Sequence, residues 1–478
     1  MVVSASPVIS AQIGQPDIIQ EHWYHSYATL TLDLNEWSDD YPEIVEMFSI
    51  GQTELGREIW MLQISDWEGG ACLSNEFEGC EHFKEIGEGE LERKEVVYID
   101  GGHHGNEHLG TELAFLVAEY YIEGWANGDQ AVIDLLATTE LHILIMLNAD
   151  GNDFDTRWNV NQVDLNRNYD HYWNTCDSTQ PGSSAFSESE TLANSIYMNE
   201  VVPDADLYIT MHTGVWIMLY PWGKWPEQPS DWEMYHYIRD EVNSNISDIP
   251  IRNANQGLYP NCGTSRDYGY GIMGYPTFTF ETDDEQFLLG TVEALSDRLG
   301  EELDVMHYLI ENVWYWRARL VVDSLEVEDG NVRLSVSNLG HSSTSNATLL
   351  YFEDEDSMEF WLPGSNEPME VIGSMDIHER KSDFNFSAPG YGFAVNATNS
   401  TVTTLDFTGA PISSEGVWAL YYQKRVIDSS MWTSELVNEG VAEVRVDDSG
   451  LLPAPTMLLV FIAFALAIID RRNIRFEQ

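Results

Sequence analysis

The run His103-His104-Gly105-Asn106-Glu107 combines imidazoles and a carboxylate at a spacing that suits a metal ion. Residues 96–100 before it are typical of a buried strand, and Leu109 to Trp125 after it have the apolar spacing of a helix. His104 and Glu107 are therefore expected at the edge where open α/β sheets bind ligands. A catalytic zinc takes imidazole and carboxylate ligands at about 2.0–2.2 Å, needs a third protein ligand and keeps one position for water. The alternative is a solvated turn that contains His103 and His108.

Further polar residues follow at the ends of expected strands. His212 comes after the apolar run 206–211, and Glu281 comes after Thr277-Phe278-Thr279-Phe280. Each has an ordinary explanation by itself, because a histidine after a strand is often a core residue and a glutamate can simply end a strand. The same holds for the other polar positions that stand out, which are Arg157, Asn166-Arg167 and Tyr259.

Strands alternate with helices over the first two thirds of the chain. This order predicts an α/β fold with a mixed, mostly parallel sheet and helices on both faces. An excursion rich in Glu and Gly, Trp67 to Arg93, interrupts it. The other expected elements are a helix through Tyr41 to Val45, strands at 58–64, 141–147 and 206–211, and helices at 129–137 and 292–316.

The pattern changes near Leu320. From there to residue 447 the chain alternates with period two between Asn and Gly turns, as in Val332 to Ser337, which predicts an antiparallel β-sandwich domain. The expected domains are an N-terminal lead (1–20), an α/β domain (21–319), the β-sandwich (320–447), a linker (448–455), a membrane segment (456–470) and a basic cytoplasmic tail (471–478).

The net charge of −58 comes from 80 Asp and Glu against 22 Lys and Arg. A phosphate backbone needs a basic footprint, so nucleic acid is excluded as a partner. The acidic residues are spread through sequence rich in Trp and Tyr, which indicates a solvated surface on a folded protein.

The C-terminal segment predicts attachment to a membrane. Residues 451–469 carry no charge, and Arg471, Arg472 and Arg475 follow them. By the positive-inside rule the arginines stay in the cytoplasm and the rest of the protein is extracellular, at the cell membrane. A buried core helix is the alternative, as is a sorting tail that is removed.

The four cysteines allow three disulfide pairings, and the sequence does not choose between them. Cys72 and Cys80 bracket a short Glu-rich stretch. Cys176 and Cys262 could pair in space if the protein is exported. Free buried thiols are the alternative.

Taken together, the motifs resemble the zinc metallocarboxypeptidase family, which contains the pancreatic carboxypeptidases A and B. The resemblance spans about Tyr24 to Tyr315, and both the order and the long spacings of the motifs match. It is carried by His104 to Glu107, Asn148 to Gly151, Val163 to Asn168, Ala185 to Glu188, His212 with Leu219 to Gly223, and Phe278 to Glu281.

The resemblance implies a zinc carboxypeptidase-like fold and a role for each matching residue. One Zn²⁺ would be held by His104, Glu107 and His212, with Glu281 as the general base. Arg157 would stabilise the oxyanion, Asn166 and Arg167 would bind the C-terminal carboxylate, and Tyr259 would close over the substrate. Two positions depart from the family pattern: Asn106 stands where an arginine is usual, and Gly214 replaces an aromatic residue and opens the next subsite.

Arg266 lies seven residues after Tyr259, where the resemblance implies the floor of the specificity pocket. A cation there favours a C-terminal Glu or Asp. The alternative is that Arg266 pairs with a neighbouring carboxylate such as Asp267 and does not meet the substrate.

The sequence therefore predicts a zinc-dependent carboxypeptidase that acts on peptide or protein C-termini. One alternative is an inert module that binds peptide or cell-wall termini without turnover. Another is a hydrolase of a different amide, such as a peptidoglycan or γ-glutamyl bond.

Overall fold

The computed structural model describes residues 24–67, 94–177, 180–203, 205–282, 292–328, 331–342, 347–352, 391–393, 402–408, 417–423 and 439–445. They belong to two compact units, and the chain passes from the first unit to the second after Val313.

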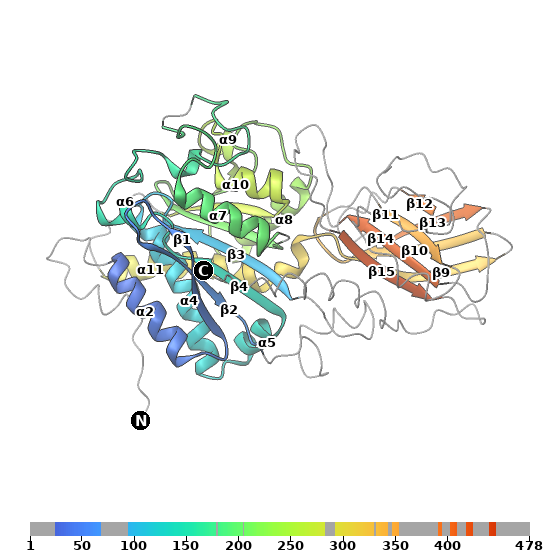
Figure 1. Cartoon of the computed structure of the whole chain (residues 1–478). Coiled ribbons are helices and arrows are strands. Elements are labelled where there is room, and N and C mark those ends of the chain that lie inside the picture. The colour runs from blue at the N-terminus through green and yellow to red at the C-terminus, as the bar shows by residue number, and fades with distance from the viewer. Residues whose placement is uncertain are drawn as a thin grey trace. The chain divides into compact units, whose positions relative to one another are not determined.

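The first unit is built around an eight-stranded mixed sheet with the order β1-β2-β4-β3-β5-β8-β6-β7 (Figure 1). The central neighbours β4, β3, β5 and β8 run parallel, whereas β1 with β2, β2 with β4 and β6 with β8 are antiparallel. The predicted mixed α/β sheet is confirmed. Its strands are β1 (Val45–Gln52), β2 (Glu58–Ile64), β3 (Glu95–Gly101), β4 (Thr139–Leu144), β5 (Leu207–Thr213), β6 (Ile217–Tyr220), β7 (Ile251–Asn253) and β8 (Thr277–Thr282).

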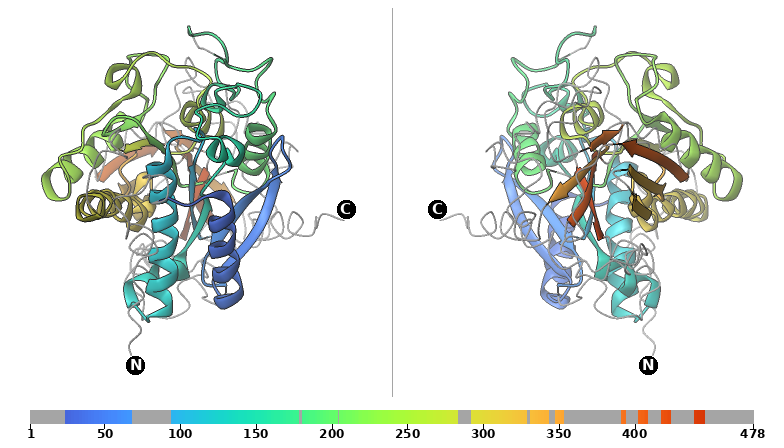
Figure 2. Two further views of the ribbon diagram at one scale, coloured as in Figure 1. Left: turned by 90° about the vertical axis from the view of Figure 1, so that its left-hand side faces the viewer. Right: turned by 90° about the vertical axis from the view of Figure 1, so that its right-hand side faces the viewer.

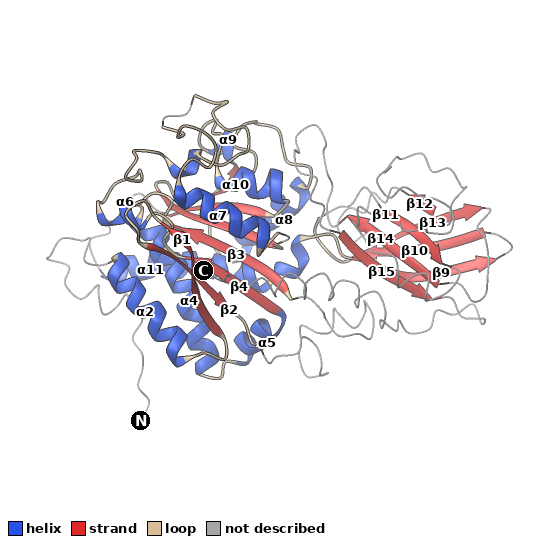
Figure 3. Ribbon diagram, viewed as in Figure 1, coloured by secondary structure: helices blue, strands red, loops and turns tan. Residues whose placement is uncertain are grey.

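Helices cover both faces of this sheet (Figures 2 and 3). The helices α4 and α5 coincide closely with the ranges expected from apolar spacing, and the helix expected over 292–316 is α11 followed by the short η5. The longer helices are α2 (Tyr27–Asp40), α4 (His108–Ala126), α5 (Gln130–Thr138), α7 (Ser189–Glu200), α8 (Trp232–Asn245) and α11 (Val292–Glu311). The short ones are α6 (Ala149–Asp153), η3 (Leu165–Arg167), α9 (Ala254–Gly257), α10 (Ser265–Tyr268), η4 (Gly269–Met273) and η5 (Val313–Trp316).

The prediction of a helix through Tyr41 to Val45 is wrong. The helix α2 lies earlier and ends at Asp40, and Val45 already begins β1. A proline disfavours helical backbone in the residue before it, so Pro42 explains why the helix does not continue through Tyr41. At the other end, Ser26 forms a capping box with Thr29, which fixes where the helix starts.

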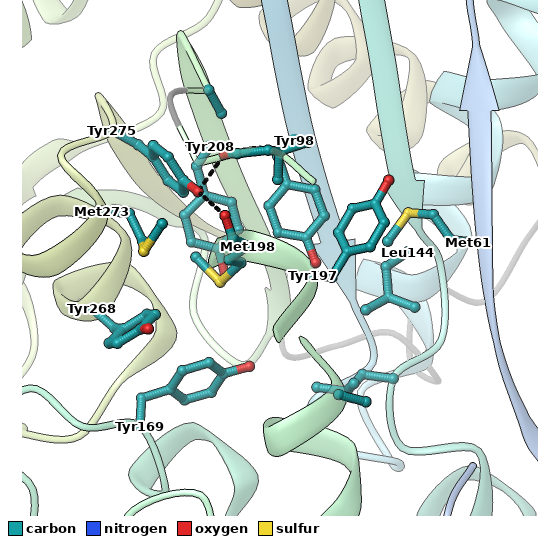
Figure 4. Close-up of a cluster of buried hydrophobic side chains, with 14 of the residues drawn as sticks. Met61, Tyr98, Leu144, Tyr169, Tyr197, Met198, Tyr208, Tyr268, Met273 and Tyr275 are labelled. Atoms are coloured by element: carbon teal, nitrogen blue, oxygen red, sulfur yellow. Dashed lines mark hydrogen bonds between the residues drawn. The ribbon is translucent and has the colours of Figure 1, made fainter. Parts of the chain in front are cut away.

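One face of the sheet packs on a core that is rich in tyrosine (Figure 4). Tyr98 of β3 and Tyr208 of β5 stack with ring centroids 5.2 Å apart. Tyr197 of α7 lies beside Tyr98, with centroids 5.9 Å apart. Burying these rings removes much apolar surface from water, but every hydroxyl then needs a hydrogen-bond partner inside the protein.

The second unit contains two antiparallel sheets, with the orders β13-β10-β9 and β12-β11-β14-β15. The strand predicted at Val332 to Ser337 is part of β10. Packing of the two sheets as a sandwich stays a prediction. The strands are β9 (Leu320–Glu328), β10 (Asn331–Asn338), β11 (Ala347–Phe352), β12 (Tyr391–Phe393), β13 (Val402–Thr408), β14 (Val417–Gln423) and β15 (Glu439–Arg445).

Several predictions fall on residues that lie outside the described ranges. These are the N-terminal lead, most of the Glu-rich excursion with Cys72 and Cys80, the linker, the membrane segment at 456–470 and the basic tail. Within the described ranges, no helix has both the length and the apolar composition that a membrane span requires.

Candidate active site

His104, Glu107 and His212 come together at the carboxyl end of the central strands. Nδ1 of His104 lies 2.7 Å from Oε1 of Glu107. Nδ1 of His212 lies 2.9 Å from Oε2 of Glu107 and 3.2 Å from Nδ1 of His104. Ligand atoms of a tetrahedral zinc with bonds of 2.0–2.2 Å lie roughly 3.3–3.6 Å apart. Each separation would have to widen by less than about 1 Å to admit the ion, and the donor set fits zinc.

The backbone around this group explains how residues 108 positions apart can meet. Gly102 directly follows β3 with φ +68°, a conformation that favours glycine, and turns the chain toward His104. Gly110 lies in the first turn of α4, where an added Cβ would be 2.8 Å from the carbonyl oxygen of His212. Its missing side chain lets α4 lie directly against β5. The alternative of a solvated turn is wrong, since His103 and His108 are both buried.

Asp164 holds the far side of the His104 ring. Its Oδ1 lies 2.9 Å from Nε2 of His104, which leaves Nδ1 of the ring facing Glu107. A carboxylate behind a ligating histidine fixes the ring and makes it a better donor. Asp164 also caps η3, accepting the backbone N–H of Asn166 at 3.1 Å. No role was predicted for Asp164, whose only signal in the sequence is its place two positions before Asn166.

The charges in this group favour a cation. Burial alone would raise the pKa of Glu107, but His104 and His212 outweigh it and hold that pKa below its ordinary value. Burial likewise would raise the pKa of Asp164, and His104 with the nearby arginines keeps that pKa low. Glu107 is thus an ionised carboxylate at the position where a metal ion would bind, and Asp164 is a second one behind the His104 ring.

Glu281 lies next to His212 on the neighbouring strand. The two are register partners in the parallel pair of β5 and β8, and both lie inside their strands rather than after them as predicted. Burial raises the pKa of Glu281; His212 opposes the rise and Glu107 adds to it. An added Cβ on Gly214 would be 3.4 Å from Oε2 of Glu281, so this glycine leaves space beside the carboxylate.

Arg157 joins the same group from the loop after α6. Its Nη1 donates to Oε1 of Glu107 at 3.1 Å, and its Nε and Nη2 donate to Oδ2 of Asp164 at 3.1 and 3.0 Å. A third of the side chain is exposed, so the guanidinium lies at the border between the buried carboxylates and solvent.

Asn166 and Arg167 lie on η3, on the other side of the metal group. Nδ2 of Asn166 is 3.1 Å from Nε2 of His212, and its Oδ1 accepts the backbone N–H of Ser265 at 3.0 Å. Nη2 of Arg167 donates to the hydroxyl of Tyr259 at 3.2 Å. Arg167 is buried whereas Tyr259 is 52% exposed, so the tyrosine lies over the guanidinium from the solvent side.

Arg266 is buried and makes three polar contacts. Its Nε donates to Oδ1 of Asp267 at 3.0 Å, Nη2 to Oδ1 of Asn261 at 2.8 Å, and Nη1 to Oγ1 of Thr279 at 3.3 Å. The pairing with Asp267 that was weighed as an alternative is therefore present. Thr279 and Glu281 are two residues apart in β8, so their side chains share one face of the sheet. Arg266 thus lies on the side of the sheet that carries Glu281.

A disulfide between Cys176 and Cys262 joins two loops of the site, and it is one of the three pairings left open. Tyr259 lies three residues before Cys262. The same loops are also joined by backbone hydrogen bonds, from Tyr169 N to Gly263 O at 3.0 Å and from Gly263 N to His171 O at 3.2 Å.

Comparisons with known proteins agree with this geometry. Residues 32–297 match the model of the zinc carboxypeptidase family. Carboxypeptidase B of Astacus astacus is 22% identical over 289 residues, which cover 55% of this chain and 86% of that protein. Carboxypeptidase E of Caenorhabditis elegans is 32% identical over 158 residues, which cover 30% of this chain but only 29% of that protein.

Among solved structures, the fold is similar to that of thrombin activatable fibrinolysis inhibitor. The TM-score is 0.50 at 20% identity, and the match covers 64% of this chain and 80% of that chain. The matched family model spans more than half of the chain and contains all three residues of the metal group, and zinc is the ion of that family. The chain belongs to the zinc carboxypeptidase family.

Proposed function

We propose that this protein removes C-terminal residues from peptides by zinc-dependent hydrolysis. The observation that carries the proposal is the convergence of His104, Glu107 and His212 with Glu281 as the register partner of His212. A module that only binds peptide needs no carboxylate poised beside the metal group, so this arrangement supports turnover.

The metal group, Glu281 and Arg157 each have a role in the hydrolysis that their contacts support. When bound by His104, Glu107 and His212, zinc supplies a Lewis acid that polarises water and the peptide carbonyl. Glu281 takes the proton of the attacking water and passes it to the leaving amine, a task suited to a carboxylate whose pKa is raised. Arg157 donates to the carbonyl oxygen as negative charge develops there.

The C-terminal carboxylate of the peptide binds to Arg167 and Asn166. A guanidinium can hold a carboxylate through two parallel hydrogen bonds, and its burial here strengthens both. Tyr259 is already in contact with Arg167 and is exposed, so it closes over the bound end of the peptide.

The Glu281→Gln variant tests the role of the general base. It keeps the size of the side chain but cannot accept the proton, so kcat should fall by about 10²–10⁴-fold. Zinc content, measured on the same sample, should not change. If the variant cleaves peptides as fast as the parent protein does, Glu281 is not the base. If the parent protein binds peptides without cleaving them, the alternative of an inert binding module is correct.

We further propose that the enzyme prefers a C-terminal Glu or Asp. Arg266 has five N–H groups and uses three of them on Asp267, Asn261 and Thr279, so among the described residues one N–H on each terminal nitrogen stays available to a carboxylate. Because Asp267 balances the charge of Arg266, the preference for an acidic C-terminal residue rests on the two available N–H groups and not on net charge. Gly223 also supports it, because an added Cβ there would lie 2.3 Å from Nη2 of Arg266.

Peptides that end in Glu, Leu and Lys test this preference. We expect kcat/KM to be highest for Glu, by roughly tenfold or more, since an unmatched buried donor costs about 1–3 kcal/mol. Arg266→Gln should remove the difference between Glu and Leu without slowing cleavage of the Leu peptide more than severalfold. Equal kcat/KM values for the three peptides, or a preference for Glu that survives in Arg266→Gln, would exclude the proposal.

A further inference from the structure

His103, the residue before the first histidine of the metal group, is completely buried. Its ring is stacked on the ring of His212, with centroids 5.4 Å apart and an angle of 26° between the planes. His103 comes from the turn after β3 and His212 from the neighbouring strand β5. The flat face of one imidazole therefore limits how far the other can rotate.

The hydrogen bonds around Asn194 fix the direction of the hydrogen bond between Tyr169 and His103. Oδ1 of Asn194 accepts from the hydroxyl of Tyr98 at 2.5 Å. Nδ2 of Asn194 can only donate, and it donates to Oδ2 of Asp100 at 3.0 Å and to the hydroxyl oxygen of Tyr169 at 2.8 Å. That oxygen is thus an acceptor, and the hydrogen of Tyr169 points to Nε2 of His103, 2.8 Å away.

The directions of these hydrogen bonds determine which nitrogen of His103 carries the hydrogen. Its Nε2 accepts from Tyr169, so the ring is neutral and carries its hydrogen on Nδ1. Nδ1 faces Oδ1 of Asp100 at 3.5 Å, and neither atom has a nearer partner among the described residues. One edge of the ring is held by a hydroxyl, the other faces a carboxylate, and a flat face supports His212. Figure 4 shows Tyr98 and Tyr169 within the tyrosine-rich core.

We propose that His103 is a positioning residue for His212 and that Tyr169 acts on the zinc site through it. The inference rests on the proposed function, because it takes His212 to be a zinc ligand. Held in this way, Nδ1 of His212 already faces His104 and Glu107, at 3.2 and 2.9 Å, before an ion arrives. Partners behind a ligand that fix its ring are worth about 10–100-fold in metal affinity or activity.

The experiment measures the Kd for Zn²⁺ of the full chain by competition with a chromophoric chelator. Tyr169→Phe keeps the ring and removes only the hydroxyl that holds His103, so Kd should rise roughly tenfold, the lower end of that range. His103→Leu removes the flat ring as well and should raise Kd further. Because these readouts are affinities, they do not depend on cleavage of a substrate.

Tyr275→Phe is the matched control. Tyr275 belongs to the same buried cluster, but its hydroxyl donates to the carbonyl oxygens of Met198 at 3.1 Å and Val202 at 2.6 Å rather than to an imidazole. Its loss should lower the urea midpoint of unfolding, as the loss of Tyr169 should, yet leave the zinc Kd within about twofold of the parent value.

A double-mutant cycle separates positioning from general damage. In a His103→Phe background Tyr169 has no nitrogen to hold, so adding Tyr169→Phe should change the zinc Kd by less than about twofold. The inference is wrong if Tyr169→Phe binds zinc as tightly as the parent protein, if Tyr275→Phe weakens zinc equally, or if the effect of Tyr169→Phe persists in the His103→Phe background. A parent protein that binds no zinc would instead overturn the proposed function.

Discussion

Two glutamates of the candidate site show how neighbours assign different tasks to one residue type. Glu107 faces His104 and His212, which hold its pKa low and keep it an anionic ligand. Glu281 is the register partner of His212 on β8, and burial raises the pKa of Glu281. Carboxylates whose pKa values are pushed in opposite directions typically divide ligand or electrostatic work from proton transfer. The pair supports Glu107 as ligand and Glu281 as base.

The buried His25, which is not one of the residues assigned to the candidate site, gives a prediction of how stability depends on pH. His25 lies between two carboxylates. Its Nδ1 is 2.8 Å from Oε2 of Glu112, and its Nε2 is 2.9 Å from Oδ2 of Asp33. Burial alone would lower the pKa of His25, but the two carboxylates outweigh it and raise the pKa to about 10, against 6.5 ordinarily. The folded state therefore holds a proton that the unfolded state has lost between these values.

The sign follows from proton binding. The stabilisation by His25 is complete below pH 6.5 and disappears as the pH rises through about 10. Over that window the unfolding free energy should fall by up to about 1.4 kcal/mol per pH unit. Urea unfolding at several pH values measures this slope, and His25→Gln should flatten it. An equal slope in the variant would show that His25 is not its source.

At the scale of elements, the parallel pairing of β5 with β8 positions two residues of the candidate site. It sets His212 beside Glu281 without any loop, and α4 presses against β5 at Gly110. Turns and loops supply the rest of the site: the turn between β3 and α4 carries His104 and Glu107, and other loops carry Arg157, η3 with Arg167, and Tyr259. Strands thus position His212 and Glu281, whereas the other residues of the candidate site lie on turns and loops that need further contacts to hold them in place.

The disulfide between Cys176 and Cys262 joins two of these loops. Its removal should affect both the stability of the protein and the binding of substrate. The bonded residues are 86 positions apart. Opening such a loop typically costs about 2–4 kcal/mol of stability. Because Cys262 lies close to Tyr259, the double variant Cys176→Ser/Cys262→Ser should also raise KM several-fold, while kcat changes little. Denaturant unfolding and steady-state kinetics measure the two effects, and an unchanged KM would show that the disulfide has no part in substrate binding.

The sequence predicts an element well where its local pattern of apolar residues is regular. The spacing of apolar residues in α4 and α5 is regular, and their ranges were predicted to within a residue or two. The helix expected through Tyr41 to Val45 failed because the effect of Pro42 was not weighed. Asp164 was missed because its role comes from a contact with His104, 60 residues earlier, which no local pattern reveals. The pairing of Cys176 with Cys262 depends on distance in space for the same reason.

At the scale of the whole molecule, Lys and Arg are rare, and half of those in residues 95–282 lie in the candidate site. The chain has a net charge of −58, and residues 95–282 contain six Lys and Arg. Three of these six are Arg157, Arg167 and Arg266, all assigned to the site. Long-range repulsion of acidic peptides is screened by salt over about 8–10 Å, whereas buried arginines close to the substrate are screened much less. The contacts within the site, rather than the overall charge, therefore decide what binds.

The central claim is that His104, Glu107 and His212 hold one zinc ion that peptide cleavage requires. Zinc content and release of C-terminal residues from a mixed peptide pool, measured on the same dialysed sample, test it most directly. We expect one zinc per chain, loss of cleavage with a chelator, recovery on adding Zn²⁺, and neither zinc nor cleavage in His212→Ala. Undiminished cleavage by a sample that contains no zinc, or by His212→Ala, would contradict the account.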